Sequence, residues 1–297
     1  MEKEIKVIAV IGPTASGKSD LAVSLALEFN GEIVSADSRQ AYRGLDIGSG
    51  KITPEEMKGI PHHLLDVASP AEIFTVSDYQ KLARAAIEGI AGRSKVPFVA
   101  GGTGFYVDAA LYDLRLPAVT PDQELRKELS LLSTEELLTR LKKLDPRRAE
   151  TIDRHNPVRL IRALEIATIL GAVPEPSDNR PRYRHLKIGI AVETERLQQK
   201  IAARLDARLE NGLIEEVERL QAKGVSWERL EAFGLEYRYV SLLLQGELSR
   251  QESRDQLLQA IIRYSKRQMT WFKRDPGTVW IKDYSEASRA VKNFLDN

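Results

Sequence analysis

The stretch "KVIAVIGPTASGKSD", residues 6–20, decides the fold class of this 297-residue chain. Its first six residues are a short, β-branched apolar run, which is typical of a buried parallel strand. The rest fits G-x-x-x-x-G-K-[ST], beginning at Gly12 and ending at Lys18 and Ser19. In this motif, backbone N–H groups and a helix N-terminus face a phosphate, Lys18 adds a positive charge, and Ser19 can hold Mg²⁺. The stretch therefore predicts a phosphate-binding loop between a strand and a helix.

The loop alone does not say whose phosphate it binds. A nucleotide hydrolase, a small-molecule kinase and a transferase that releases diphosphate can all use such a loop. A motor-type ATPase would also have an apolar strand that ends in Asp, but the candidate strand, "PFVAGGTG" at residues 97–104, ends in Gly and Thr. "EIVSAD", residues 32–37, does end in an acid, but on the strand next in sequence. These features disfavour the ATPase and leave kinases and other phosphate-handling enzymes.

The arrangement of apolar segments predicts a mixed α/β fold. Residues 1–112 alternate between β-type and helix-type patterns, which favours a parallel sheet with helices on both faces. After residue 115, the amphipathic helical stretches 124–144 and 157–170 follow with no strand between them, and the Pro-rich segment 171–184 is typical of a loop.

We therefore expect a P-loop NTPase-like parallel sheet with a helical insertion. The core would comprise residues 1–114 and 185–297, with a helical C-terminal part. The insertion would comprise residues 115–184.

Charge is distributed unevenly along the chain, although the formal net charge is only +1. Residues 140–187 contain twelve Lys or Arg against six Asp or Glu, and residues 263–274 contain five against none. Such segments are either solvated helix faces or patches that face a polyanion. The chain has no cysteine, which excludes disulfides, thiolate zinc sites and a cysteine nucleophile.

The N-terminal sequence "MEKEIKVIAV" lacks a signal-peptide layout, and no apolar run approaches the roughly 18 residues that span a bilayer. We therefore expect a cytoplasmic protein that does not bind membranes.

A second group of polar residues follows the strand that ends near Asp37. Ligands of such sheets bind beyond the carboxyl ends of the strands, so Asp37 should lie near the phosphate loop as a general base or a metal ligand. Arg39 and Gln40, in the same turn, can hydrogen-bond base edges or phosphates. Thr103, within "AGGTGFY", offers a hydroxyl to the same cleft. The alternative is that both segments are ordinary turns, with Asp37 capping a helix.

At this point the chain resembles the tRNA dimethylallyltransferase family, also called the tRNA isopentenyltransferase or IPP transferase family. The resemblance covers roughly residues 6–274. "SADSRQAYRGLDIGSGK" is its most specific motif, and the others occur in the family's order: "GPTASGKS", "GIPHHLLDV", "VSDYQ", "GGTGFYVDAAL", "HNPVRLIRALEI", "RLDARLENGLIEEVERL" and "KRQMTWFKR".

The resemblance implies a reaction. A dimethylallyl group would pass from dimethylallyl diphosphate to the exocyclic N6 amine of the adenosine 3′-adjacent to the anticodon, releasing diphosphate. Mg²⁺ would assist, the partner would be the tRNA anticodon stem-loop, and the protein would be a monomer.

The resemblance also implies roles for particular residues. Asp37 would be the general base, with Thr103 and Lys18 also in the catalytic site. The diphosphate would be bound by Gly12, Pro13, Thr14, Ala15, Ser16, Gly17, Lys18, Ser19 and Arg204, with Ser19 on the metal. The tRNA would be contacted by Asp37, Ser38, Arg39, Gln40, Thr103, Arg126, Val158, Arg159, Leu160, Ile161 and Arg162.

Other functions remain open from the sequence. A P-loop kinase could use "DPRRAETIDRHNPVRLIR", residues 145–162, as an Arg-rich lid over its phosphates. An isopentenyltransferase acting on free adenine nucleotides would share the early motifs but not need the basic insertion. An RNA-binding module that has lost catalysis is disfavoured by the intact Lys18, Ser19 and Asp37. "AFGLEYRYV", residues 232–240, departs from the family pattern by lacking its Lys.

Overall fold

The computed structural model describes residues 4–175 and 180–297, which form two compact units. One unit comprises Met1–Tyr112 and Pro181–Asn297, and the other is Asp113–Arg180. The expected end of the insertion at residue 184 therefore lies inside the core unit. The reason is local: Arg182 N–H donates to the Leu111 carbonyl, and Tyr112 forms a bridge with Pro181, so the returning chain joins the core before the next strand begins. Part of the Pro-rich segment, residues 176–179, lies outside the described residues.

The core contains the predicted parallel sheet. Its six strands have the order β3-β2-β4-β1-β5-β6, and every neighbouring pair is parallel. The strands are β1 (Lys6–Ile11), β2 (Gly31–Ser35), β3 (His62–His63), β4 (Val96–Gly101), β5 (Arg184–Ile190) and β6 (Val279–Ile281). Because β2, β4 and β1 are consecutive in the sheet, the loops that follow them emerge side by side at one edge.

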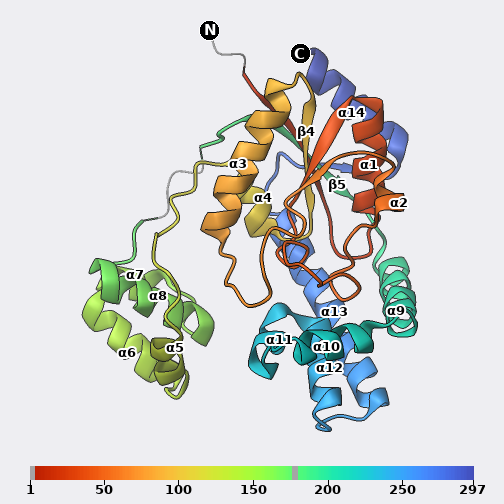
Figure 1. The fold of residues 1–297 in the computed structure, drawn as a ribbon. Helices are drawn as coiled ribbons and strands as arrows, with labels where there is room; N and C mark the ends of the chain where they lie inside the picture. The colour runs from red at the N-terminus through yellow and green to blue at the C-terminus, as the bar shows by residue number, and fades with distance from the viewer. Residues whose placement is uncertain (1–3, 176–179) are drawn as a thin grey trace. The chain divides into compact units, whose positions relative to one another are not determined.

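Helices cover both faces of the sheet (Figure 1). On one face, α1 (Lys18–Glu28) and α14 (Tyr284–Asp296) pack on apolar side chains of the central strands in one buried cluster. On the other face, α3 (Val76–Gly92) packs against β2 and β4, and α4 (Gly104–Leu111) packs against β4 and β1. The short α2 (Pro54–Met57) lies in the connection between β2 and β3.

A second layer of helices belongs to the same unit and lies in the lower part of Figure 1. It comprises α9 (Thr194–Glu210), α10 (Leu213–Ala222), α11 (Trp227–Phe233), α12 (Leu235–Leu244) and α13 (Arg250–Phe272). α9 and α13 share an apolar cluster around Ile201 and Leu257, while α10, α11 and α12 bury side chains against the loop that follows β2. This loop is therefore held by helices that come much later in the chain.

All regular elements of the insertion's described residues are α-helices, joined by loops. Its helices are α5 (Gln123–Ser130), α6 (Thr134–Leu144), α7 (Pro146–Thr151) and α8 (Pro157–Leu170). The expectation of one helix over 124–144 is wrong, because Ser133 caps a new helix with a capping box closed by Glu136. Leu137, Leu141 and Leu160 are fully buried in a separate core. The insertion thus has its own apolar centre.

Within residues 4–175 and 180–297, the structure contains no helix with the length and apolar character that crossing a bilayer demands.

Candidate active site

The loop between β1 and α1 has the backbone of a phosphate cradle. Gly17 has φ 88° and Ala15 has φ 61°, and both left-handed residues turn the chain tightly onto the helix. No side chain of the described residues caps α1 at its start, so its first N–H groups are available to a ligand. The Ser16 hydroxyl is buried and, among the described residues, has no hydrogen-bond partner. A bound anion is the natural partner for these donors.

A cavity of about 350 Å³ opens beside this loop. Its charged and hydroxyl-bearing lining residues are Lys18, Ser19, Asp20, Glu56, Lys200 and Arg204. The pKa of Lys18 is lowered to about 8, chiefly by burial; the Asp37 charge raises it, and the Arg204 and Arg208 charges add to the lowering. Burial, with Arg208, likewise lowers the pKa of Arg204 to about 10. Burial is the largest cause of both shifts, and neighbouring cations add to it, an effect that an anionic ligand would offset.

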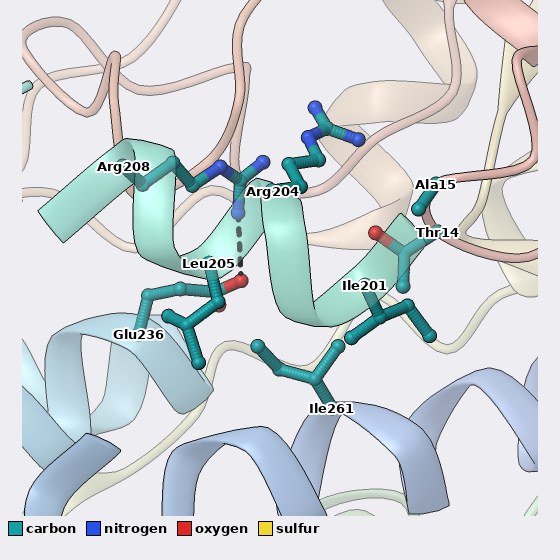
Figure 2. Close-up of a pocket in the computed structure, with 8 residues that line it drawn as sticks. All are labelled: Thr14, Ala15, Ile201, Arg204, Leu205, Arg208, Glu236 and Ile261. Carbon is teal, nitrogen blue, oxygen red and sulfur yellow. Dashed lines mark hydrogen bonds and ion pairs between the residues drawn. The ribbon is translucent and has the colours of Figure 1, made fainter. Parts of the chain in front are cut away.

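Two arginines of α9, Arg204 and Arg208, line a small pocket together with Thr14 and Ala15 of the phosphate loop (Figure 2). Arg208 is neutralised by Glu236 at 2.9 Å and also donates to the Gly48 carbonyl. Arg204 instead donates only weakly to the Gly50 carbonyl, at 3.4 Å, and also lines the larger cavity. Arg204 is therefore less neutralised than Arg208, and its binding of a diphosphate stays a prediction.

The oxygen groups of the cavity fit Mg²⁺. Ser19 contributes a hydroxyl, and Asp20 and Glu56 contribute carboxylates. Within the described part of the chain, no group of three or more acidic, histidine or cysteine side chains makes a complete metal cage. Mg²⁺ usually binds through one or two protein oxygens together with substrate phosphates and water, so this donor set suits it.

The turn after β2 carries Asp37. Asp37 Oδ1 accepts a hydrogen bond from Arg39 N–H at 2.9 Å, which fixes the carboxylate in an Asx turn. The Ser38 N–H donates to the Thr103 hydroxyl at 3.2 Å, and Thr103 N–H donates to the Ala36 carbonyl. In the described residues Asp37 Oδ2 makes no hydrogen bond. The carboxylate is thus oriented on one side and can accept a proton on the other.

Gln40 and Arg39 lie in the same turn, but their side chains contact different parts of the protein. The Gln40 amide donates to the Gly50 carbonyl at 3.0 Å, which ties the turn to the loop beneath Arg204. The Arg39 guanidinium lies against Gly234, where a Cβ would be 3.2 Å from its Nε. Gly234 belongs to the "AFGLEYRYV" segment, so the departure from the family pattern borders the predicted base-binding turn.

In the insertion, the predicted tRNA-binding residues divide into buried and exposed groups. Leu160 is fully buried in the insertion core, so its side chain supports α8 from within, and the predicted tRNA contact at this position has no exposed side chain to make it. Val158 is 74% exposed, and Arg159 has a largely exposed side chain with one weak partner, Asp153 at 3.5 Å. Ile161 packs partly on the core. Of these residues, Val158 and Arg159 present the most side chain to solvent.

Arg126 and Arg162 are committed to an internal ion pair. Both donate to the buried Glu165 carboxylate, Arg126 through two bonds at 2.7 and 2.8 Å and Arg162 at 3.2 Å. Arg162 also donates to the Val119 carbonyl. Their side chains remain about one-third exposed, and the Glu165 carboxylate neutralises part of the positive charge that each could offer to a phosphate.

Two residues that join the site were missed from the sequence. Gln268 of α13 is buried and bonds both the phosphate loop and the turn after β4. Glu216 of α10 is buried and accepts hydrogen bonds from the loop at Asp46–Gly48. A signal existed for both, because each is a polar residue at a position where the helical period expects an apolar one.

Three loops at neighbouring strand ends therefore combine a phosphate cradle, a cationic cavity and an oriented carboxylate. This arrangement defines a P-loop α/β protein whose phosphate loop lies near the Asp37 carboxylate. A family model described as IPP transferase matches residues 40–275, and the chain belongs to that family.

Proteins similar to this chain agree with that assignment. It is 45% identical over 273 residues to tRNA dimethylallyltransferase 2 of Citrifermentans bemidjiense, covering 92% of this chain and 88% of the relative. It is 41% identical to tRNA dimethylallyltransferase of an Exiguobacterium species, covering 99% and 96%. The crystal structure of the full-length tRNA isopentenylpyrophosphate transferase of Bacillus halodurans matches with TM-score 0.74 and 37% identity, covering 99% and 96%.

Proposed function

We propose that this protein transfers a dimethylallyl group from dimethylallyl diphosphate to the N6 amine of the adenosine 3′-adjacent to the anticodon of tRNA. The observation that carries the proposal is the position of the Asp37 carboxylate. It lies beside the phosphate loop with one oxygen fixed by Arg39 N–H, and its charge raises the pKa of Lys18. A proton acceptor and a diphosphate site thus lie together.

In this reaction the N6 nitrogen forms a bond to the first carbon of the prenyl group, and the bond from that carbon to the diphosphate oxygen breaks. The N6 proton passes to Asp37 Oδ2, and the electron pair of the broken bond leaves with the diphosphate. Lys18 and Arg204 stabilise the negative charge that develops on the leaving group. When bound, Mg²⁺ held by Ser19 with Asp20 and Glu56 would supply further positive charge to that leaving group.

The adenine must leave its stack to reach the carboxylate. Anticodon-loop bases are unpaired, so extruding one costs less than flipping a paired base. Exposed basic residues on the insertion and on α13, including Arg159 and Lys266, would bind the tRNA backbone.

The direct test is incubation of the protein with Mg²⁺, radiolabelled dimethylallyl diphosphate and unmodified tRNA. We expect label in tRNA and none in AMP offered in its place. Label in AMP would indicate an enzyme for free adenine nucleotides. ATP consumption without prenyl transfer would indicate a kinase and would refute the proposal.

The role of Asp37 is tested with Asp37→Asn, which keeps the acceptor for Arg39 N–H but cannot take the N6 proton. We expect transfer to fall by about 10²–10⁴, the usual worth of a positioned base, while tRNA affinity changes by less than about threefold. Asp46→Asn is the matched control, because Asp46 is an exposed aspartate further along the same loop. Near wild-type transfer by Asp37→Asn would rule out Asp37 as the base.

A further inference from the structure

Gln268 lies between the two loops that would hold the two substrates. Its side-chain oxygen accepts from Thr14 N–H in the phosphate loop at 2.9 Å, and its side-chain nitrogen donates to the Gly102 carbonyl at 2.7 Å. The side chain is 7% exposed. One buried amide therefore satisfies one backbone group in each loop, and each bond uses a different end of the amide.

The side chain of Gln268 is closely packed against the backbone that it contacts. A Cβ at Gly102 would lie 2.5 Å from Gln268 Nε2, so the backbone approaches the amide as closely as a residue without a side chain allows. One helical turn further along α13, Trp271 occupies the space beside Gly104 and donates to the Asp108 carboxylate at 3.0 Å. The same face of α13 thus packs against the whole turn from Gly102 to the start of α4.

These two loops have different tasks in the proposed reaction. The loop with Thr14 binds the diphosphate. The turn after Gly102 carries Thr103, whose hydroxyl accepts from Ser38 N–H and so holds the Asp37 turn. The separation between the loops sets the distance between the prenyl carbon and the N6 nitrogen.

We propose that Gln268 is a positioning residue that sets the spacing between the diphosphate subsite and the acceptor-base subsite. This inference rests on the proposed function for its catalytic consequence. A displacement of about 1 Å between reacting groups can cost about 10²-fold in rate without weakening the binding of either substrate. Replacing the Gln268 side chain is therefore expected to change kcat and not KM.

The test compares two substitutions of similar shape. Gln268→Met removes both hydrogen bonds. Gln268→Glu keeps an acceptor for Thr14 N–H but places a second oxygen against the Gly102 carbonyl. We expect both to lower kcat for prenyl transfer by about 10- to 10²-fold, with each KM within about threefold of wild type.

Ser253→Ala is the matched control. It also removes a buried hydrogen bond of α13, from the Ser253 hydroxyl to the Tyr239 carbonyl, fifteen residues away from Gln268 on the same helix. We expect its kcat to stay near wild type. An equal loss of kcat in Ser253→Ala would show that Gln268 acts only through general stability. A raised KM for tRNA with unchanged kcat in Gln268→Met would make Gln268 a tRNA contact and overturn the proposal.

Hydrogen exchange separates this inference from the proposed function, because it needs no turnover. We expect Gln268→Met to speed amide exchange in both segments 12–19 and 101–105, and Ser253→Ala to change neither. Exchange that accelerates in one segment alone, or in neither, would refute the coupling. If the wild-type protein transfers no prenyl group, the proposed function fails while the exchange result still decides whether Gln268 joins the two loops.

Discussion

The buried carboxylate of Glu216 offers a quantitative test of how the loop beneath Arg204 is held. Its Oε2 accepts from Asp46 and Ile47 N–H at 3.0 and 2.7 Å, and its Oε1 accepts from Gly48 N–H at 3.0 Å and from the Tyr237 hydroxyl at 2.8 Å. The side chain is 2% exposed. Four donors therefore depend on one charged acceptor group.

Glu216→Gln replaces one of the two oxygens with an NH₂ group. The less costly orientation puts the nitrogen at the Oε1 position, because the Tyr237 hydroxyl can rotate and accept from it. Gly48 N–H then has no acceptor, which costs about 1–3 kcal/mol. The bonds from Asp46 and Ile47 become neutral and lose about half their strength, or roughly 1 kcal/mol together. The total is about 3 kcal/mol.

The assay is urea unfolding. With an m-value of about 3 kcal/mol/M, a loss of about 3 kcal/mol lowers the midpoint by about 1 M. Glu218→Gln is the matched control, since Glu218 is exposed on the same helix and should shift the midpoint by less than about 0.2 M. A shift for Glu216→Gln as small as that of the control would refute the reasoning that the charge of this carboxylate organises the loop.

Three further predictions follow from named groups. Because Lys18 has a pKa of about 8, it is cationic below that pH and neutral above it, so its affinity for inorganic diphosphate should fall as pH rises through 8. Calorimetry should find this midpoint in the wild type but not in Lys18→Arg, whose side chain stays cationic. A midpoint that persists in Lys18→Arg would assign the titration to another group. Burial raises the pKa of Glu32, but hydrogen bonds from basic neighbours, Arg93 first, lower it to about 2. The stability that Glu32 contributes is present above its unfolded-state pKa of about 4.5 and is lost as pH falls toward 2. The difference in Tm between wild type and Glu32→Gln should therefore disappear over that range. A Tm difference that does not depend on pH would contradict this. Arg159→Ala should weaken tRNA binding and lower the slope of log affinity against log salt by about one, and an unchanged slope would remove Arg159 from the interface.

The parts of the fold that depend on local chemistry could be predicted from the sequence. The phosphate loop, the α/β alternation and the α-helical insertion follow from glycine positions, β-branched runs and amphipathic periods. The helix break at Ser133 was missed, although the Ser133–Glu136 pair is a capping box that sequence can reveal. It was missed because the apolar period continues across the break.

The environments of charged residues were harder to predict. The resemblance implies that Arg126 and Arg162 contact tRNA, yet both pair with Glu165, which lies three residues after Arg162 but 39 after Arg126. A resemblance transfers the residue type and position, but not how much of its charge a neighbour neutralises. Leu160 shows the same limit for burial, since it stands between two exposed or half-exposed residues and faces the core.

Gln268 and Glu216 explain why the site as a whole escapes prediction from local sequence. Gln268 bonds Thr14 across 254 residues, and Glu216 bonds Gly48 across 168. Each loop can orient its own groups through short-range bonds, as Asp37 does with Arg39 N–H. The spacing between loops has no such local source, because loops at neighbouring strand ends share no covalent constraint. Buried polar side chains from α10 and α13 supply it, so the catalytic distance is set only when these late helices have packed on the core.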